Sequence, residues 1–169
     1  NVTEGHYEFV EVSAPAGFDC DRSPVGVHVN AEDLQGEQTI VVEKMNHHKR
    51  ALTISKRDLE TGASVPNTSF HIHGVNLGYE NDVVTGADGT VTLSDMPSGC
   101  YEITETDVPA PYLLDTNNRK TVWIDAAKDQ DVVADFRNST RPGLRLLKRD
   151  QQTDQPIQGA TFLVEEVNG

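Results

Sequence analysis

The sequence predicts an all-β fold made of Greek-key β-sandwich repeats in tandem. Three observations support this fold class. Short segments rich in β-branched residues are separated by turn signals, and no stretch sustains the apolar period of about 3.6 residues that indicates a helix. The same segments also recur along the chain. Seven or so strands in roughly 90 residues are what a Greek-key sandwich requires.

The most complete set of predicted strands lies between residues 51 and 138. The first strand contains LTISKRD (52–58), whose strict alternation is typical of a half-buried strand. GADG (86–89) is a turn signal ahead of TVTLS, and the two prolines of DVPAPY (107–112) end the strand before them. In order, strands are expected at 51–57, 68–74, 82–85, 90–94, 100–106, 120–125 and 131–138.

Long stretches of the chain repeat, which indicates tandem units. Tyr7 and Tyr101 hold matching positions 94 residues apart, and Lys56 and Lys148 hold matching positions 92 residues apart. The aligned stretches are GHYEFVEVSAPAGF (5–18) with GCYEITETDVPAPY (99–112), TIVVEKMNHHKRALTISKRD (39–58) with DVVADFRNSTRPGLRLLKRD (131–150), and SVPNTSFHI (64–72) with PIQGATFLV (156–164).

The phase of the repeat divides the chain into one complete unit and two halves. Residues 51–140 are expected to be a complete repeat, residues 1–48 the C-terminal half of a preceding one, and residues 143–169 the N-terminal half of a following one. The linkers NHHKRA and NSTRPG are short and lack the Gly/Ser richness of a loose tether. We therefore expect a stiff string in which neighbouring repeats of the same protein are partners.

Composition and charge narrow the possible partners. The 169-residue chain carries 27 acidic against 14 basic residues, a formal charge of −13. That balance disfavours nucleic acid, whose binders gather Lys and Arg on one face. No apolar run approaches the length of a membrane span. We expect no nucleic-acid partner and no membrane insertion in this segment.

The cysteines and histidines give weaker signals. Cys20 and Cys100, the only cysteines, match no zinc or redox spacing, which leaves open two unpaired thiols or a disulfide across domains or between chains. His71 and His73 share one strand face and could bind a metal. Because the pattern offers no third ligand, we expect two solvated side chains, no metal and no cofactor.

A lysine lies in line with core residues on the first strand of the complete unit. Leu52, Ile54 and Lys56 share one face of the alternating segment. The same parity turns Glu105 inward after Tyr101 and Ile103, and turns Asn138 inward after Ala134 and Phe136. Three strands would then each direct one polar side chain, Lys, Glu or Asn, into a single sandwich.

Burial would change the chemistry of these three groups. An isolated buried charge costs several kcal/mol, so the lysine pKa falls and the glutamate pKa rises until both groups are neutral. A neutral amine is a nucleophile, and a neutral carboxylic acid can donate a hydrogen bond to a carbonyl. The asparagine side chain supplies the carbonyl together with an ammonia leaving group.

Five motifs stand in order along the chain: LTISKRDLETG, SVPNTSF, GADGTVTL, GCYEITETDVPAPY and VVADFRN. In this order they resemble the collagen-adhesin B-type (CnaB, SpaA-like) domains of Gram-positive surface adhesins and pilins. The resemblance implies an immunoglobulin-like, prealbumin-like sandwich. It further implies an extracellular location on the cell surface, anchored to the cell wall or within a fibre such as a pilus.

The resemblance also implies a spontaneous isopeptide bond from Lys56 to Asn138, with Glu105 as the catalytic, proton-shuttling acid. The bond forms once, so the chain would modify itself and would not be an enzyme. Glu11 and Asn46 would serve the preceding unit, and Lys148 would serve the following one. The sequence departs from the repeat at Lys44, which stands where the complete unit has a phenylalanine.

The residues leave alternatives for the site and for the function. Lys56 could be a solvated edge residue, with Glu105 as its surface salt-bridge partner and Asn138 in a linker turn. The leading function is a structural stalk or shaft module of an adhesin or pilus. The alternatives are an adhesin module that binds a host matrix protein or glycan, and an accessory domain of a larger surface enzyme.

Overall fold

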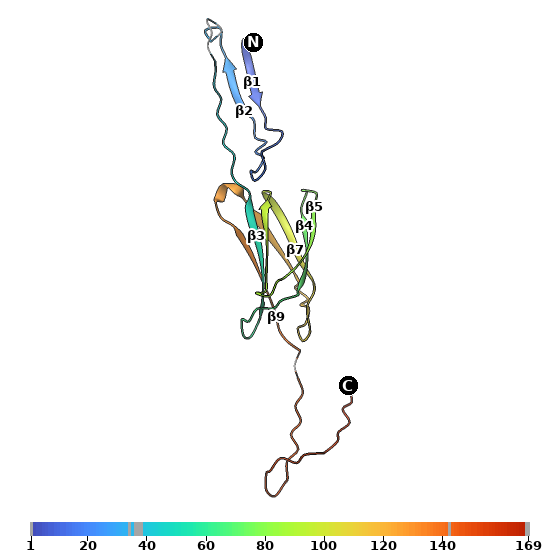
Figure 1. Ribbon diagram of the computed structural model, residues 1–169. Helices are drawn as coiled ribbons and strands as arrows, with labels where there is room; N and C mark the ends of the chain where they lie inside the picture. The colour runs from blue at the N-terminus through green and yellow to red at the C-terminus, as the bar shows by residue number, and fades with distance from the viewer. Residues whose placement is uncertain (1, 34, 36–38, 142, 168–169) are drawn as a thin grey trace.

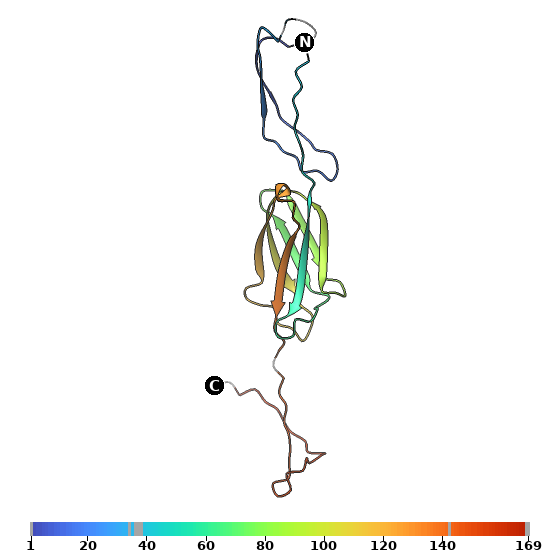
Figure 2. The ribbon, with the colours of Figure 1, turned by 90° about the vertical axis from the view of Figure 1, so that its left-hand side faces the viewer.

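The computed structural model describes residues 2–33, 35, 39–141 and 143–167. Residues 50–138 form a β-sandwich (Figure 1), and the N-terminal and C-terminal segments extend from its opposite ends (Figure 2). In the described part of the chain no helix has the length and apolar character needed to cross a membrane. The all-β prediction is confirmed.

Seven strands make the two sheets of the sandwich. They are β3 (Arg50–Asp58), β4 (Ser69–Gly74), β5 (Tyr79–Val84), β6 (Thr90–Met96), β7 (Gly99–Asp107), β8 (Arg119–Ile124) and β9 (Val132–Asn138). One sheet has the order β6-β3-β9 and the other the order β5-β4-β7-β8. These strands agree with the predicted ranges to within a few residues, while the short 3-10 helix η1 (Ala126–Lys128) was not expected.

The first and last strands of the sandwich are neighbours. β3 pairs in parallel with β9 and antiparallel with β6, so β3 is the central strand of its sheet. Apolar side chains from both sheets fill the space between them, and the rings of Phe70 and Phe136 meet across it with centroids 4.8 Å apart. The buried core comprises Leu52, Ile54, Phe70, Ile72, Met96, Tyr101, Ile103, Ile124, Ala134 and Phe136.

The N-terminal segment repeats the pairing of two sandwich strands. β1 (Gly5–Phe9) and β2 (Val25–Val29) form a separate antiparallel pair. Tyr7 is opposite Val27 in this pair, just as Tyr101 is opposite Val122 between β7 and β8. Residues 39–47, which align with β9, form no strand.

The C-terminal segment repeats the hydrogen bonds that end β3. The Ile157 amide donates to the Lys148 carbonyl at 2.9 Å, as the Val65 amide donates to the Lys56 carbonyl at 3.1 Å. The aspartate two residues after each lysine accepts two backbone amides with its side chain. Residues 143–167 therefore contain a copy of the turn that follows β3, but they form no strand.

Hydrogen bonds hold the linker between the N-terminal segment and the sandwich. The Lys49 amide donates to the Gly17 carbonyl, and the Asp19 amide donates to the His47 carbonyl, both at 2.9 Å. The Asp19 side chain in turn accepts the Ser98 amide at 3.2 Å. The linker is therefore hydrogen-bonded to the N-terminal segment, and Asp19 of that segment contacts the sandwich.

Gly89 brings the β5–β6 turn against the end of β3. Its φ is +73°, and a Cβ there would lie 2.6 Å from the Lys56 carbonyl oxygen and 2.9 Å from the Val65 amide nitrogen. The Gly89 carbonyl accepts the Lys56 amide at 2.7 Å. A side chain at this position would push the turn away from the buried lysine.

We predict that Gly89→Ala destabilises the sandwich by at least about 2 kcal/mol more than Gly62→Ala does. Gly62 has a similar φ of +72° but open space around its Cβ position, so the pair separates the backbone clash from the conformational cost. Urea unfolding followed by the fluorescence of Trp123, the only tryptophan, measures the difference. Equal losses in the two variants would contradict the close approach.

Candidate functional site

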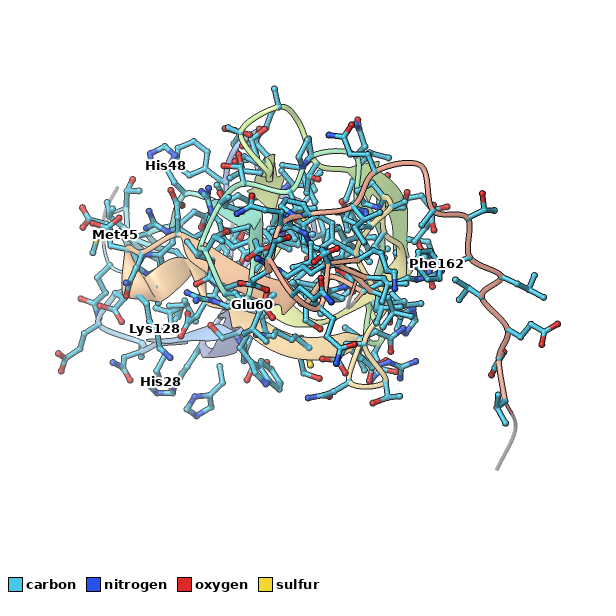
Figure 3. All side chains as sticks on the ribbon, turned by 90° about the horizontal axis from the view of Figure 1, so that it is seen from below. His28, Met45, His48, Glu60, Lys128 and Phe162 are labelled. Atoms are coloured by element: carbon cyan, nitrogen blue, oxygen red, sulfur yellow. The ribbon has the colours of Figure 1, made fainter. Side chains whose placement is uncertain are left out.

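The candidate site lies where β3 and β9 end, at the end of the sandwich nearer the C-terminal segment (Figure 1). Figure 3 views the molecule from this end, with Glu60 of the turn after β3 labelled. Lys56 and Asn138 come from the paired strands of one sheet, and Glu105 comes from β7 of the facing sheet. The sandwich thus brings the three predicted side chains together.

All three side chains are withdrawn from solvent. The exposed fractions are 0% for Lys56, 0% for Glu105 and 3% for Asn138. The alternative in which Lys56 is a solvated edge residue with a surface partner is therefore wrong, because the strand ends inside the sandwich. Tyr112 lies beside the lysine, with its ring centroid 5.9 Å from Lys56 Nζ.

Glu105 lies between the amine and the amide. Its Oε1 is 3.7 Å from Lys56 Nζ, and its Oε2 accepts a hydrogen bond of 2.8 Å from Asn138 Nδ2. Glu105 Oε1 has no hydrogen-bond partner among the described residues. The ammonium form of Lys56 would be poorly satisfied as well, because the acceptor found for it is the Arg57 carbonyl at 3.5 Å.

Burial moves both ionisable groups toward their neutral forms. It lowers the pKa of the Lys56 amine, and the charge of Glu105 only partly opposes that shift. It raises the pKa of the Glu105 carboxyl, against the opposing effects of the Asn138 hydrogen bond and of Lys56. Both shifts make the uncharged form of each group easier to reach than it is in water.

Backbone hydrogen bonds fix where Lys56 and Glu105 lie. The backbone amide of Lys56 donates to the Gly89 carbonyl, and the backbone carbonyl of Lys56 accepts from the Val65 amide. The Glu105 amide donates to the Asn118 carbonyl at 2.7 Å, and Asn118 Nδ2 donates back to the Glu105 carbonyl at 2.8 Å. The amine and the acid thus stand on strands whose main chain is hydrogen-bonded to the adjoining turns.

The Leu113 carbonyl orients the asparagine amide. It accepts Asn138 Nδ2 at 2.7 Å, and because a carbonyl only accepts, it identifies the nitrogen end of the amide. The same nitrogen faces Glu105, so the acid lies beside the atom that would leave. Sequence reasoning missed the roles of Leu113 and Asn118, since a backbone carbonyl and a single half-buried loop asparagine carry no motif.

In the N-terminal segment, Glu11 and Asn46 also form an acid–amide pair. Asn46 Nδ2 donates to Glu11 Oε1 at 2.5 Å, and Glu11 Oε2 accepts the Asp21 amide at 3.0 Å. Lys44 turns toward Asp21, with Nζ 3.3 Å from its Oδ2. Lys148 is exposed on the C-terminal segment, so the structure places it in neither pair.

The two histidines of β4 are paired with carboxylates on β5 and are not simply solvated. His71 Nδ1 is 2.7 Å from Asp82 Oδ1, and its Nε2 is 2.9 Å from Glu80 Oε2. His73 Nδ1 also contacts Glu80. Among the described residues no group of three or more potential ligands has the arrangement to hold a metal. In the same part of the chain both cysteines are free thiols.

Comparisons with known proteins identify the sandwich. Residues 50–140 match the model of the SpaA prealbumin-like fold domain, and no curated protein matches the chain. Among solved structures, GBS52, the minor pilin of Streptococcus agalactiae, is 17% identical with a TM-score of 0.50, over 88% of this chain and 65% of that one. At that identity the likeness shows the fold alone.

Two further structures resemble the chain less closely in shape. The streptococcal ancillary pilin is 21% identical with a TM-score of 0.47, over 85% of this chain and 44% of that one. The Bacillus anthracis TIE protein is 27% identical with a TM-score of 0.46, over 81% and 25%. The chain thus spans less than two thirds of each of these three proteins.

The His71 cluster generates a pH prediction. A carboxylate only accepts hydrogen bonds, so an imidazole ring that contacts two carboxylates must donate from both nitrogens, as the imidazolium does. The hydrogen bond to Asp82 is the main cause of the raised pKa of His71. The contacts of His71 with the two carboxylates stabilise the folded state fully at pH values below the unfolded-state pKa of about 6.5. This stabilisation is lost as the pH rises through the higher pKa that His71 has in the folded state. Asp82→Asn should lower that folded pKa.

An NMR titration of the His71 ring measures this change directly. Asp135→Asn is the matched control, because Asp135 is an exposed acid on β9 of the other sheet. An unchanged His71 pKa in Asp82→Asn would contradict the assigned pairing.

Proposed function

The chain belongs to the family of SpaA prealbumin-like fold domains, and on this premise we propose that it is a structural stalk or shaft module of a bacterial surface adhesin or pilus. We further propose that an autocatalytic isopeptide bond between Lys56 and Asn138 locks this module. The observation that supports the bond is the fully buried Lys56–Glu105 pair in contact with the Asn138 amide. A charged pair with so few hydrogen bonds is costly to bury, whereas a covalent amide removes the charge.

The proposed reaction balances without a cofactor. The neutral Lys56 amine attacks Cγ of Asn138, and a new C–N bond forms. Glu105 passes a proton to Nδ2, the nitrogen that it contacts at 2.8 Å, and the C–Nδ2 bond breaks to release ammonia. Glu105 regains the proton that the former amine loses. The reaction happens once per chain and is not turnover.

The bond would join the first strand of the sandwich to the last. It closes a loop between two residues that are 82 positions apart, Lys56 and Asn138. Treated like a disulfide, such a loop closure restricts the unfolded chain by about 4–5 kcal/mol. Because the linkers leave the sandwich next to β3 and β9 (Figure 1), tension along the chain would load the bond and bypass the strands between. This is what a shaft requires.

The same proposal covers the rest of the chain. Residues 1–48 and 143–169 are proposed as halves of further repeats, with Glu11 and Asn46 serving the preceding one and Lys148 the following one. Neighbouring repeats and other fibre subunits are the proposed partners, and the cell wall or a surface fibre is the proposed location. The likeness in fold to a minor pilin supports the proposed location and the proposed fibre partners.

We predict that intact-mass analysis of the folded chain gives a mass one ammonia below the sequence mass, and that peptide mapping finds a branched peptide joining Lys56 and Asn138. Glu105→Gln should fold but keep the full mass, because the amide preserves the size of the side chain and cannot shuttle the proton. Lys148→Ala is the control that keeps the crosslink. A full mass in the folded native chain would refute the bond.

We predict that the bond limits how far the chain extends under force. Lys56→Ala should release up to about 280 Å of additional contour length, at roughly 3.4 Å for each of the residues between the two crosslinked positions. Single-molecule stretching measures this length, with Lys148→Ala as the matched control. Equal extension of the native and Lys56→Ala chains would show that the load does not pass through the bond.

A further inference from the structure

We infer that His6 and His28 form a binding site for a transition-metal dication on the solvent-facing side of the β1–β2 pair. Nδ1 of each ring would bind the same ion, and water would occupy the remaining coordination positions. The inference is independent of the proposed Lys56–Asn138 bond, because neither residue of that bond lies in β1 or β2.

The pairing of β1 with β2 brings the two histidines together. His6 is directly opposite His28 in the antiparallel register, and side chains in such positions have Cβ atoms about 4.5–5.5 Å apart. The Nδ1 atoms of the two rings are 3.2 Å apart. Two residues that are 22 positions apart in the chain thus present two ring nitrogens at one point on the surface.

The separation of the two nitrogens suits one metal ion. With a zinc–nitrogen distance of about 2.05 Å, two nitrogen ligands are about 3.3 Å apart in a tetrahedral site. At neighbouring positions of a square-planar copper or nickel site, two nitrogens are about 2.9 Å apart. The observed separation of 3.2 Å lies between these two values.

The two rings are also turned so that their Nδ1 sides approach each other. The ring centroids are 4.1 Å apart and the ring planes are inclined by 33°, so the Nδ1 atoms are closer together than the centroids. Both side chains are exposed, and Figure 3 shows His28 at the rim of the molecule. Each ring is therefore free to rotate until its Nδ1 lone pair points at a shared ion.

Without a metal, the two rings satisfy each other through one proton. One Nδ1 donates and the other accepts, according to the tautomers of the rings. Two imidazolium rings would both donate and would repel each other at this distance. A metal ion takes the place of the shared proton, and each ring then carries its own proton on Nε2.

The histidines of β4 lack this arrangement. His71 and His73 each contact a carboxylate of β5 through a ring nitrogen. For His6 and His28, the polar side-chain contact found within the described residues is the one between the two rings. The nitrogens of the β1–β2 pair are therefore not committed to an acid.

The type of ligand selects the metal. Imidazole suits zinc, copper and nickel, whereas magnesium and calcium require oxygen ligands. Among the described residues no third potential ligand is in place beside the pair, so the protein supplies two nitrogens. Glu8 shares a face of β1 with His6, and its negative charge favours a cation there.

The pair stays at the surface in a repeat built like the sandwich. His6 and His28 align with Cys100 and Trp123, which are opposite each other in the pairing of β7 with β8. Trp123 is 71% exposed and Cys100 is half-buried, although β7 also pairs with β4 on its other side. A neighbouring strand on the other side of β1 would therefore leave both histidines accessible to an ion.

The test is an NMR titration of the 15N-labelled native 169-residue chain with ZnCl2. We expect the Nδ1 resonances of His6 and His28 to shift together and to saturate, while those of His73 stay in place. His6→Ala should raise the zinc concentration needed to shift His28 at least tenfold, because it removes one of the two protein ligands. His73→Ala is the matched control and should leave the titration of His6 and His28 unchanged.

The intact mass of the same sample reports the proposed Lys56–Asn138 bond separately, so either proposal can fail alone. The absence of saturating shifts at His6 and His28 overturns the metal site, whatever the mass of the chain. A His28 titration that is the same in His6→Ala as in the native chain also overturns it, because the two rings would then not share one ion. MgCl2 should cause no shift, and a response equal to that of zinc would show attraction to the acidic surface in place of a site.

Discussion

The burial of Lys56 beside Glu105 is the interaction on which the rest of the site depends. Both side chains are fully withdrawn from water, and the distance of 3.7 Å between Nζ and Oε1 is beyond hydrogen-bond range. Neither charge is well compensated, so burial drives both groups toward their neutral forms. In the proposed function this pair supplies the reactive groups, at a place where an apolar pair would contribute only packing.

The sandwich keeps this pair in place with its main chain. Lys56 lies on the central strand of one sheet and Glu105 on an inner strand of the other, and both are pinned by backbone hydrogen bonds to neighbouring turns. The aromatic contact between Phe70 and Phe136 lies in the same core. A side chain positioned in this way would need no loop to be ordered for the proposed reaction.

The alternation of inward and outward side chains along the strands predicted much of the site. Particular residues show which contacts this alternation could not predict. The alternation of LTISKRD was enough to place Lys56 with Leu52 and Ile54. It could not reveal that the Leu113 carbonyl orients Asn138, because that contact depends on the path of the loop between β7 and β8. It also treated His71 as solvated, because its partner Asp82 is a neighbour only through the pairing of β4 with β5.

The sequence by itself determined the all-β class, the approximate strands and the inward direction of three polar side chains, because these follow from a local period of two residues. Only the tertiary structure decided that β3 and β9 are parallel neighbours and that Glu105 faces them from the other sheet. Strand order and sheet packing are set by contacts between residues far apart in the chain, and a local pattern does not specify them. The distances on which the chemistry depends come from that packing.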